Sequence, residues 1–150
     1  MKKFTGTIRP LAASDRKAWW PLWAGYLKFY KSTLAPDVTE TTFERLTSGK
    51  EPMFGLVAEI DGRLVGITHC VVHRSTWARD HYIYLEDLFV APDVRGAGAG
   101  RALIEAVYAR ANDMGIERVY WLTHESNDTA RALYDRVAER SGFIHYRRPR

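Results

Sequence analysis

The sequence is poor in cysteine and has no long apolar run. Its single cysteine, Cys70, excludes an internal disulfide and a cysteine-based zinc site. A membrane-spanning helix needs about 18 uncharged apolar residues, and no window of the sequence approaches this. The N-terminus is basic but lacks the apolar stretch of a signal peptide. We therefore expect a cytoplasmic protein with no membrane segment.

The charge is close to balanced and is not typical of a nucleic-acid-binding protein. Lysine and arginine number 22 against 18 acidic residues, which gives a formal net charge of +4. The basic residues are scattered, apart from Arg147, Arg148 and Arg150 at the end of the chain. No aromatic and basic string of the RNA-binding type is present. A nucleic-acid partner is therefore not expected, whereas a small polyanionic ligand suits the mild positive charge.

Length and composition indicate one folded domain over residues 1–150. Hydrophobic residues make up 46% and charged residues 27%, which are ordinary values for a globular protein. A chain of 150 residues can bury one substantial core and is too short for two ordinary ones. Disordered, collagen-like and low-complexity classes are excluded.

Residue spacing predicts a mixed α/β domain with antiparallel strands early and a crossover helix later. Asp61-Gly62, between two β-rich runs, is typical of a two-residue hairpin turn. Pro21 must kink the first helix or begin a new one. The expected strands lie at 4–9, 54–60, 64–73, 82–90, 118–123 and 143–146, and the expected helices begin at the caps Ser14 and Thr39, after Gly100 and at the cap Asn127.

A glycine-rich turn joins the fourth of these strands to a helix. Gly96, Gly98 and Gly100 place backbone N–H groups and the positive end of a helix dipole at one spot, which favours a phosphate. A nucleotide-hydrolysing P-loop is disfavoured because Arg101 and Ala102 stand where it needs lysine and serine or threonine. A dinucleotide site is disfavoured because the spacing is G-x-G-x-G after antiparallel strands. The alternative is a tight turn without a ligand.

The motif Arg95-x-x-Gly98-x-Gly100 resembles the acyl-CoA loop of the GNAT superfamily of N-acetyltransferases. The resemblance begins at the strand Leu85-Glu86-Asp87-Leu88-Phe89-Val90 and continues through Asn127-x-x-Ala130-x-x-Leu133-Tyr134 to Gly142-Phe143. It covers the C-terminal half in detail, while the N-terminal helices match in placement. The fold that it implies is a mostly antiparallel twisted sheet of about six to seven strands flanked by four helices.

The resemblance also implies how acetyl-CoA binds. The backbone of Leu88, Phe89 and Val90 would pair with the pantetheine arm as an added strand does. Asn127 would bond the pantetheine through its side chain, and its alternative role is a plain helix cap. The pyrophosphate would be held by the N–H groups of Arg95, Gly96, Ala97, Gly98, Ala99, Gly100 and Arg101. No metal is expected.

Two residues are candidates for the chemistry. Tyr134 matches the family's general acid, although a tyrosine pKa of about 10 against about 8.5 for a thiol favours a hydrogen bond over full proton transfer. Its alternative role is core packing. Glu86 is the candidate base for an amine acceptor, since only the neutral amine attacks a thioester. The alternative for Glu86 is a structural ion pair. Regular strand alternation would keep Glu86 and Asp87 on opposite faces.

Other residues that attract attention have simpler explanations. His69 and His73 would lie on one strand face about 13 Å apart, too far to share a metal. Cys70 is expected to be buried packing, and His124 to be a loop residue. The aromatic residues of the first helix are expected to be mostly core, with one or two facing a cationic acceptor: Trp19, Trp20, Trp23, Tyr26 and Tyr30.

The function expected from these features is transfer of an acetyl group from acetyl-CoA to a primary amine by direct attack in a ternary complex. The acceptor would be a polyamine, a small amine or a lysine side chain, because Leu85-Glu86-Asp87 resembles the diamine acetyltransferases and the C-terminal end resembles the histone and polyamine branch. The alternative is a non-catalytic acyl-CoA-binding module. A homodimer is a further expectation.

Overall fold

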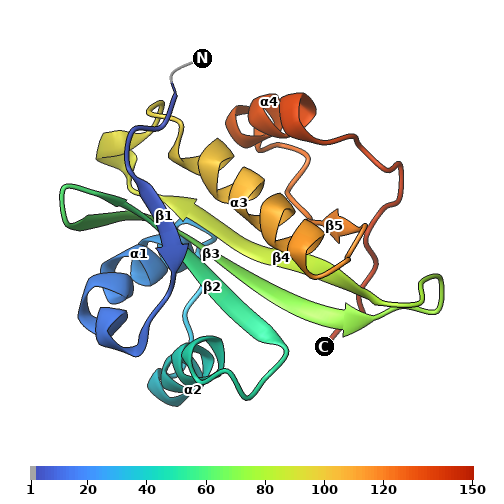
Figure 1. The fold of residues 1–150 in the computed structure, drawn as a ribbon, viewed down its shortest axis with the longest axis horizontal. Coiled ribbons are helices and arrows are strands. Elements are labelled where there is room, and N and C mark those ends of the chain that lie inside the picture. Colours follow the sequence, from blue (N-terminus) through green and yellow to red (C-terminus); the bar gives the residue numbers. More distant parts are fainter. Residues whose placement is uncertain (1–2) are drawn as a thin grey trace.

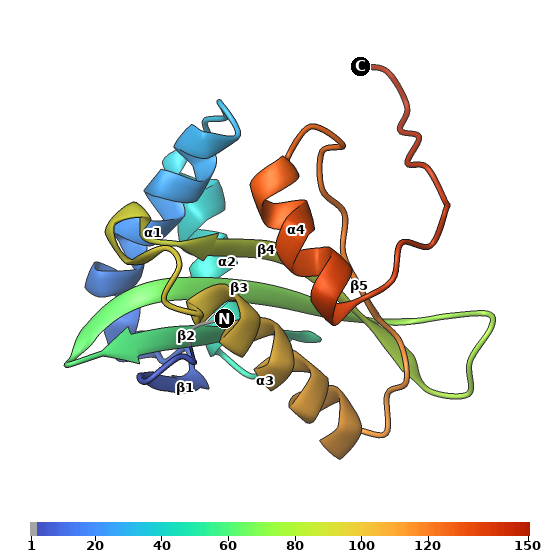
Figure 2. The same cartoon turned by 90° about the horizontal axis from the view of Figure 1, so that it is seen from above.

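The computed structural model describes residues 3–150 and shows one sheet between two layers of helices (Figure 1, Figure 2). Five strands follow the order β1-β2-β3-β4-β5 across the sheet. The strands are β1 (Thr7–Pro10), β2 (Met53–Ile60), β3 (Arg63–Arg74), β4 (His81–Val90) and β5 (Val119–Tyr120). The helices are α1 (Arg16–Phe29), α2 (Pro36–Thr47), α3 (Ala99–Asp113) and α4 (Asp128–Val137), with 3-10 turns at Ala13–Asp15 and Pro92–Val94.

The topology is the predicted mixed one. Strands β1 to β4 are antiparallel neighbours, and β4 pairs with β5 in parallel because α3 carries the chain back across the sheet. The turn between β2 and β3 has positive φ at Asp61 (48°) and Gly62 (79°), as a tight hairpin needs. The predicted α/β class, the early antiparallel strands and the four helices are confirmed.

Each face of the sheet buries its own core. Helices α1 and α2 cover one face, where Trp19, Trp23 and Phe43 pack against Ile67 and Phe89. Helix α3 covers the opposite face with Leu103, Ile104 and Val107, all fully buried. Alternate residues of β2 and β3 pack into the two cores, so the sheet is apolar on both sides.

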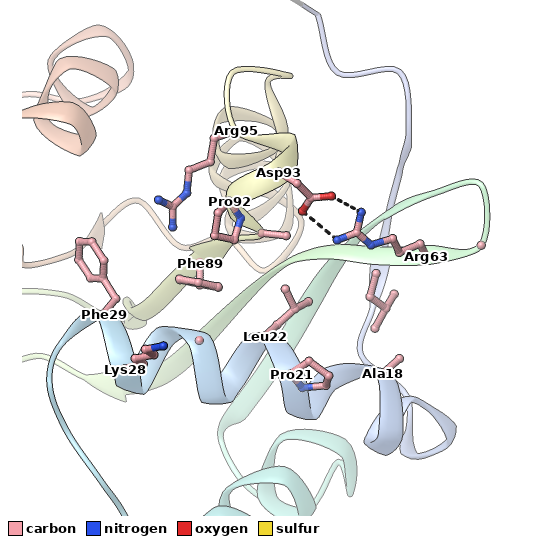
Figure 3. A pocket seen from close by; sticks show the side chains of 14 residues that line it. Ala18, Pro21, Leu22, Lys28, Phe29, Arg63, Phe89, Pro92, Asp93 and Arg95 are labelled. Atoms are coloured by element: carbon pink, nitrogen blue, oxygen red, sulfur yellow. Dashed lines mark hydrogen bonds and ion pairs between the residues drawn. The ribbon is translucent and has the colours of Figure 1, made fainter.

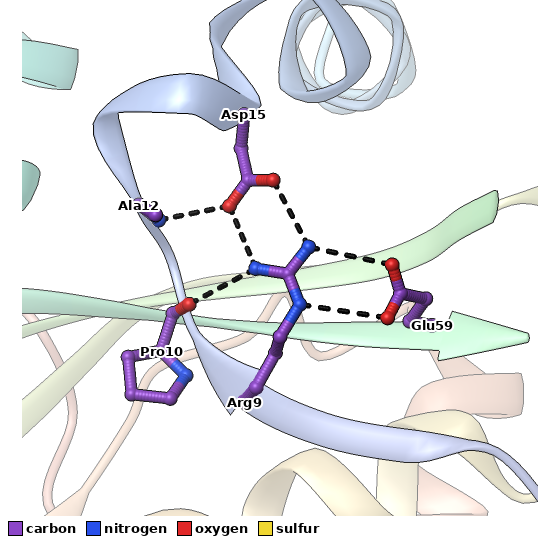
Figure 4. Close-up of polar contacts among 5 residues, drawn as sticks. All are labelled: Arg9, Pro10, Ala12, Asp15 and Glu59. Carbon is purple, nitrogen blue, oxygen red and sulfur yellow. Dashed lines mark hydrogen bonds and ion pairs between the residues drawn. The ribbon is translucent and has the colours of Figure 1, made fainter. Parts of the chain in front are cut away.

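An ion-pair network fixes the entry to α1 (Figure 4). The guanidinium of Arg9 donates to both oxygens of Asp15, at 2.8 and 3.0 Å, and also lies 3.4 Å from a carboxylate oxygen of Glu59. The backbone N–H of Ala12 donates to the same Asp15 carboxylate at 2.8 Å. The hydrogen bonds from Arg9 hold the pKa of Asp15 below its usual value. The network ties α1 to β1 and β2.

The predicted strand at 143–146 is wrong. Residues 138–150 are all described and contain neither helix nor strand, and every residue from 139 to 150 is exposed. Phe143 is 83% exposed and Tyr146 84%. The alternating pattern is present, but no strand within residues 3–150 pairs with it to accept its hydrogen bonds. The sheet therefore has five strands rather than six or seven.

Both predicted N-caps in the first half are also wrong. A 3-10 turn that includes Ser14 precedes α1, which begins at Arg16. Helix α2 begins at Pro36, and Thr39 is a buried residue inside it whose hydroxyl accepts from Trp23 Nε1 at 3.3 Å. Because Thr39 is buried against α1, its hydroxyl bonds Trp23 and does not cap a helix. Pro21 lies inside a helix that continues through it.

Candidate active site

Strand β4 carries a β-bulge at the predicted base. His69 of β3 is paired with Asp87, whereas its neighbour Cys70 is paired with Leu85, so Glu86 is an extra residue on β4. The hydroxyl of Thr68 donates to the carbonyl oxygen of Asp87 at 2.8 Å and supports the irregular backbone. Bulges of this kind redirect side chains and are frequent beside active sites.

The bulge brings two carboxylates together, which corrects the expectation from regular alternation. Asp87 Oδ2 lies 2.9 Å from His69 Nδ1, on the face covered by α1. The carboxylate of Glu86 interacts electrostatically with Asp87 and with His69. Burial, and next the negative charge of Asp87, raise the pKa of Glu86. A carboxyl with a raised pKa is suited to accept a proton near neutral pH.

Four tyrosines surround this acidic pair. Burial and the Asp87 carboxylate raise the pKa of Tyr26 on α1 and of Tyr30 at its C-cap, whose ring centroids are 5.0 Å apart. On the other side, Tyr84 of β4 stacks on Tyr120 of β5 at 5.1 Å. Burial, followed by the charge of Glu86, raises the pKa of both of these phenols. Aromatic faces beside carboxylates form an environment that favours a cation.

Tyr134 reaches the same region from α4. Its ring meets Trp121 edge to face at 5.4 Å, and Tyr30 is near enough to contribute to the pKa of its phenol. Burial, with a smaller contribution from Tyr30, raises the pKa of Tyr134 to about 12. The phenol is therefore a hydrogen-bond donor at every physiological pH.

The second half of β4 has an open edge. Within residues 3–150, β4 pairs with β5 at Ile83 and Tyr84 and with β3 along its whole length. Beyond Tyr84 the backbone on the β5 side, including Leu88, Phe89 and Val90, has no strand beside it. An extended ligand with amide groups can add to such an edge as a strand does. Arg95 Nε donates to the carbonyl oxygen of Val90 at 3.2 Å, where the edge ends.

The glycine-rich turn follows directly after this edge. Gly96 (φ 86°) and Gly98 (φ 87°) are both left-handed, and Gly98 is the N-cap of α3. As at any helix N-terminus, the first-turn N–H groups of Ala99 and Gly100 have no acceptor within the helix. The sequence predicted this strand, turn and helix correctly, and the N–H groups at the turn suit a phosphate.

A cavity of about 950 Å³ opens between α1 and the end of β4 (Figure 3). Three cationic side chains line it, from α1, β3 and the glycine-rich turn: Lys28, Arg63 and Arg95. Its acidic lining residue, Asp93, pairs with Arg63 at 2.7 Å. The guanidinium of Arg95 lies 5.4 Å from the ring centroid of Phe89. The charge of the lining and the adjacent N–H groups fit a polyanionic ligand.

Four other residues that the sequence singles out have defined contacts or burial in the structure. Asn127 is at the N-cap position of α4, but its Nδ2 donates to Thr123 Oγ1 at 3.2 Å and does not cap the helix. His73 lies 2.7 Å from the hydroxyl of Tyr120, and the ring of His124 is 5.8 Å from that of Tyr30. Burial raises the pKa of Cys70 to about 12, which suits a packing role.

The sequence did not reveal that Asp87 lies in the candidate site beside Glu86. Its partner His69 is 18 positions away in the sequence, and the bulge that turns both carboxylates to one face depends on cross-strand register. The sequence offered one signal of the bulge, which is that the apolar residues Leu85 and Leu88 are three positions apart. A regular strand cannot bury both of them on one face.

No helix among residues 3–150 is long and apolar enough to span a bilayer. In the same part of the chain, no three His, Cys, Asp or Glu side chains are grouped to hold a metal ion.

Comparison with known proteins identifies the family of this chain. The profile of the acetyltransferase (GNAT) family matches residues 17–138. The D-amino-acid N-acetyltransferase HPA3 of Saccharomyces cerevisiae is 34% identical over 143 residues, which cover 94% of this chain and 89% of HPA3. The uncharacterized N-acetyltransferase YhfO of Bacillus subtilis is 31% identical over 141 residues, or 93% of this chain and 94% of YhfO.

Solved structures show the same fold. The structure of AAC(6')-Iy in complex with the bisubstrate analogue CoA-S-monomethyl-acetylneamine superimposes with a TM-score of 0.83 at 19% identity. The match covers 97% of this chain and 98% of that one. The family match over most of the chain, together with the two relatives, decides the classification. The chain belongs to the acetyltransferase (GNAT) family and is an acetyl-CoA-dependent N-acetyltransferase.

Proposed function

We propose that the protein acetylates the primary amine of a small cationic acceptor, such as a polyamine or another small amine. The observation that carries this proposal is the pair Glu86 and Asp87, brought to one face by the bulge and surrounded by tyrosines. An ammonium group is attracted by the carboxylates and by the aromatic faces. The pair lies beside the open edge of β4, where the acyl donor would bind.

A small acceptor is favoured over a lysine side chain of a basic protein. The protein carries a formal net charge of +4, so a highly basic partner would be repelled during encounter. A small polyamine is held locally by the two carboxylates and is far less affected by the net charge. Among the acceptor classes that the sequence predicts, these charges favour polyamines and other small amines.

The relatives suggest a second acceptor class. HPA3 is named for D-amino acids, which carry a carboxylate next to the amine. In this chain Glu86 and Asp87 would repel that carboxylate, since like charges at close range disfavour binding. We therefore favour an amine without a neighbouring carboxylate, and the two classes are separated by experiment.

The proposed acetyl-CoA site uses the open edge and the glycine-rich turn. The backbone of Leu88, Phe89 and Val90 would bond the pantetheine arm, with Asn127 supplying its side-chain amide from the start of α4. The pyrophosphate would lie at the N-terminus of α3. The seven residues of the turn would hold it: Arg95, Gly96, Ala97, Gly98, Ala99, Gly100 and Arg101.

Glu86 would take the proton of the acceptor, directly or through a water. An amine of pKa about 10.4 is less than about a thousandth neutral at pH 7, so a base is needed for attack on the thioester. The raised pKa of Glu86 increases its strength as a base, and it stays useful while the pH is above that pKa. The amine then attacks the acetyl carbonyl directly, without an acyl-enzyme.

Tyr134 would act on the departing sulfur. A phenol with a pKa of about 12 opposes full proton transfer to a thiolate of pKa about 8.5 by about 5 kcal/mol. Donation of a hydrogen bond has no such cost and stabilises the negative charge that develops on the sulfur as the carbon–sulfur bond of the thioester breaks. We therefore assign Tyr134 this role, and the thiolate takes its proton from solvent.

We also propose that the protein is a homodimer. The support is the C-terminal segment, in which Phe143, Ile144 and Tyr146 are 83%, 73% and 84% exposed. Large apolar side chains gathered in one exposed segment are typical of an interaction surface. A second copy offers the same segment in return, as a two-fold interface requires.

A cytoplasmic location is the remaining part of the proposal. It is supported by the single cysteine, which is buried and has no second cysteine in the sequence to pair with. Proteins of oxidising compartments more often carry paired cysteines. Fractionation of cells that express the protein tests this location.

A panel of acceptors incubated with acetyl-CoA tests the proposed activity. The panel holds diamines, polyamines, monoamines, lysine peptides, D-amino acids and neutral alcohols, and release of free thiol is measured. We expect the highest kcat/KM with diamines and polyamines. A preference for D-amino acids contradicts the acceptor class. Acetyl-CoA binding with no turnover on any amine favours the non-catalytic binding module.

A further inference from the structure

A buried hydrogen-bond chain runs from α1 to the acidic pair. The indole Nε1 of Trp19 lies 3.0 Å from Nε2 of His69, and Nδ1 of the same imidazole lies 2.9 Å from Oδ2 of Asp87. Trp19 is 0% exposed, and the side chains of His69 and Asp87 are 3% and 13% exposed. Water therefore has little access to Trp19 and His69 in this series of hydrogen bonds.

The donors and acceptors in the chain determine one tautomer. An indole N–H can donate but cannot accept, so His69 Nε2 must offer a lone pair to it. The neutral imidazole then carries its proton on Nδ1, which donates to the Asp87 carboxylate. Trp23, whose ring centroid is 5.3 Å from that of His69, does not compete, because its own N–H donates to Thr39 Oγ1.

These hydrogen bonds also fix the orientation of the Asp87 side chain. Its side chain is held by His69 and its backbone carbonyl by the Thr68 hydroxyl, both from β3. Glu86, the extra residue of the bulge, is its immediate neighbour, and the Tyr26 hydroxyl interacts with the same carboxylate from α1. One oxygen of Asp87 is thus engaged inside the protein while the carboxylate borders the tyrosine-lined site.

We propose that Trp19 and His69 are positioning residues for the acceptor site: Trp19 holds His69 in the Nδ1–H tautomer, and His69 holds Asp87 against the acceptor. The inference rests on the proposed function for the place of the acceptor, whereas the tautomer follows from the hydrogen bonds alone. Neither Trp19 nor His69 touches the reacting atoms. Their effect would be on acceptor binding, because Asp87 is the group that they orient.

Nuclear magnetic resonance of the imidazole nitrogens at pH 8 tests the tautomer without any substrate. We expect His69 of the parent protein to show a protonated Nδ1 and an unprotonated Nε2. Trp19→Phe keeps an aromatic ring and removes the N–H, so the Nε2–H form should become populated. The matched control is Trp20→Phe, the next residue along α1, which is 44% exposed and should leave the His69 signals unchanged. A protonated Nε2 in the parent overturns the assignment.

Kinetics then test the positioning role. Trp19→Phe should raise the acceptor KM about tenfold with little change in the KM for acetyl-CoA, since the Nε2–H tautomer of His69 cannot donate from Nδ1 to the Asp87 carboxylate. His69→Asn keeps an N–H donor near the place of Nδ1, so it should retain a lower acceptor KM than His69→Leu. Bound acetyl-CoA, measured by calorimetry, shows that each variant is folded.

The outcomes separate the two proposals. An unchanged acceptor KM in Trp19→Phe and equal values in the two His69 variants overturn the positioning role while the amine acetyltransferase remains. A parent protein that acetylates no amine, yet shows Nδ1-protonated His69, contradicts the proposed function and confirms the tautomer.

Discussion

Leu85 and Leu88 of β4 both pack on the α3 face of the sheet although they are three positions apart. In a regular strand, residues at an odd separation face opposite sides. The bulge at Glu86 adds one residue to β4 and resolves the conflict. The same extra residue turns Glu86 and Asp87 toward α1 together, so the acidic pair of the site is a consequence of how two leucines are buried.

Replacement of Glu86 by glutamine tests the proposed base. Glu86→Gln keeps the size of the side chain and removes its ability to take a proton. At subsaturating amine we expect the rate to fall about 100-fold at pH 7 and about 10-fold or less at pH 9, where neutral amine is more abundant. The parent's rate should also rise with pH through the same range, because the neutral fraction of an amine with a pKa of about 10.4 increases.

The control for this prediction is Glu44→Gln on the exposed side of α2, which should match the parent at both pH values. Equal activity of Glu86→Gln and the parent at pH 7 would show that Glu86 is a structural carboxylate.

Local signals in the sequence predicted the parts of the fold that local interactions decide. Asp61-Gly62 correctly marked the β2–β3 turn, because positive φ at two successive positions restricts the residue types. The apolar spacing of α3 correctly indicated its buried face, and the glycines correctly marked the strand-to-helix turn. For the site, the sequence brought Glu86 and Tyr134 forward by resemblance, and their roles remain proposals.

The errors concern features that depend on distant parts of the chain. The bulge follows from the register between β3 and β4, and the His69–Asp87 contact crosses that register. Thr39 became a buried partner of Trp23 because α1 packs on α2. The segment 143–146 has a strand pattern, but a strand forms only where a neighbouring edge accepts its hydrogen bonds.

The glycine-rich turn gives a prediction for acetyl-CoA binding. Gly98→Val places a branched side chain at a left-handed φ of 87° and blocks close approach to the backbone N–H groups at the start of α3. Calorimetry should show micromolar binding for the parent and binding weaker by about tenfold or more for the variant. Gly49→Val is the control for backbone strain, because Gly49 also has positive φ (72°) and open space around it. If Gly98→Val binds as tightly as the parent, the turn is not the phosphate site.

Removal of one hydroxyl tests the role of Tyr134. Tyr134→Phe keeps the ring contact with Trp121 and should lower kcat by about 10- to 1000-fold with little change in acetyl-CoA affinity, since the lost bond is strongest when sulfur carries charge. Tyr108→Phe is the matched control, because the hydroxyl of Tyr108 donates to the Val137 carbonyl and has a structural partner. An unchanged kcat in Tyr134→Phe would leave this tyrosine a packing residue.

The exposed C-terminal segment predicts the oligomeric state. Three large apolar side chains at 143, 144 and 146 are more than 70% exposed, and their contact with a second copy would remove that surface from water. Light scattering coupled to gel filtration should therefore give a dimer for the parent protein at micromolar concentration. Phe143→Asp puts a charge into the proposed interface and should give a monomer. Trp77→Asp changes an aromatic residue that is equally exposed, at 79%, in the loop between β3 and β4, and should leave the dimer intact. A monomeric parent, or a dimer that persists in Phe143→Asp, would exclude the segment as the interface.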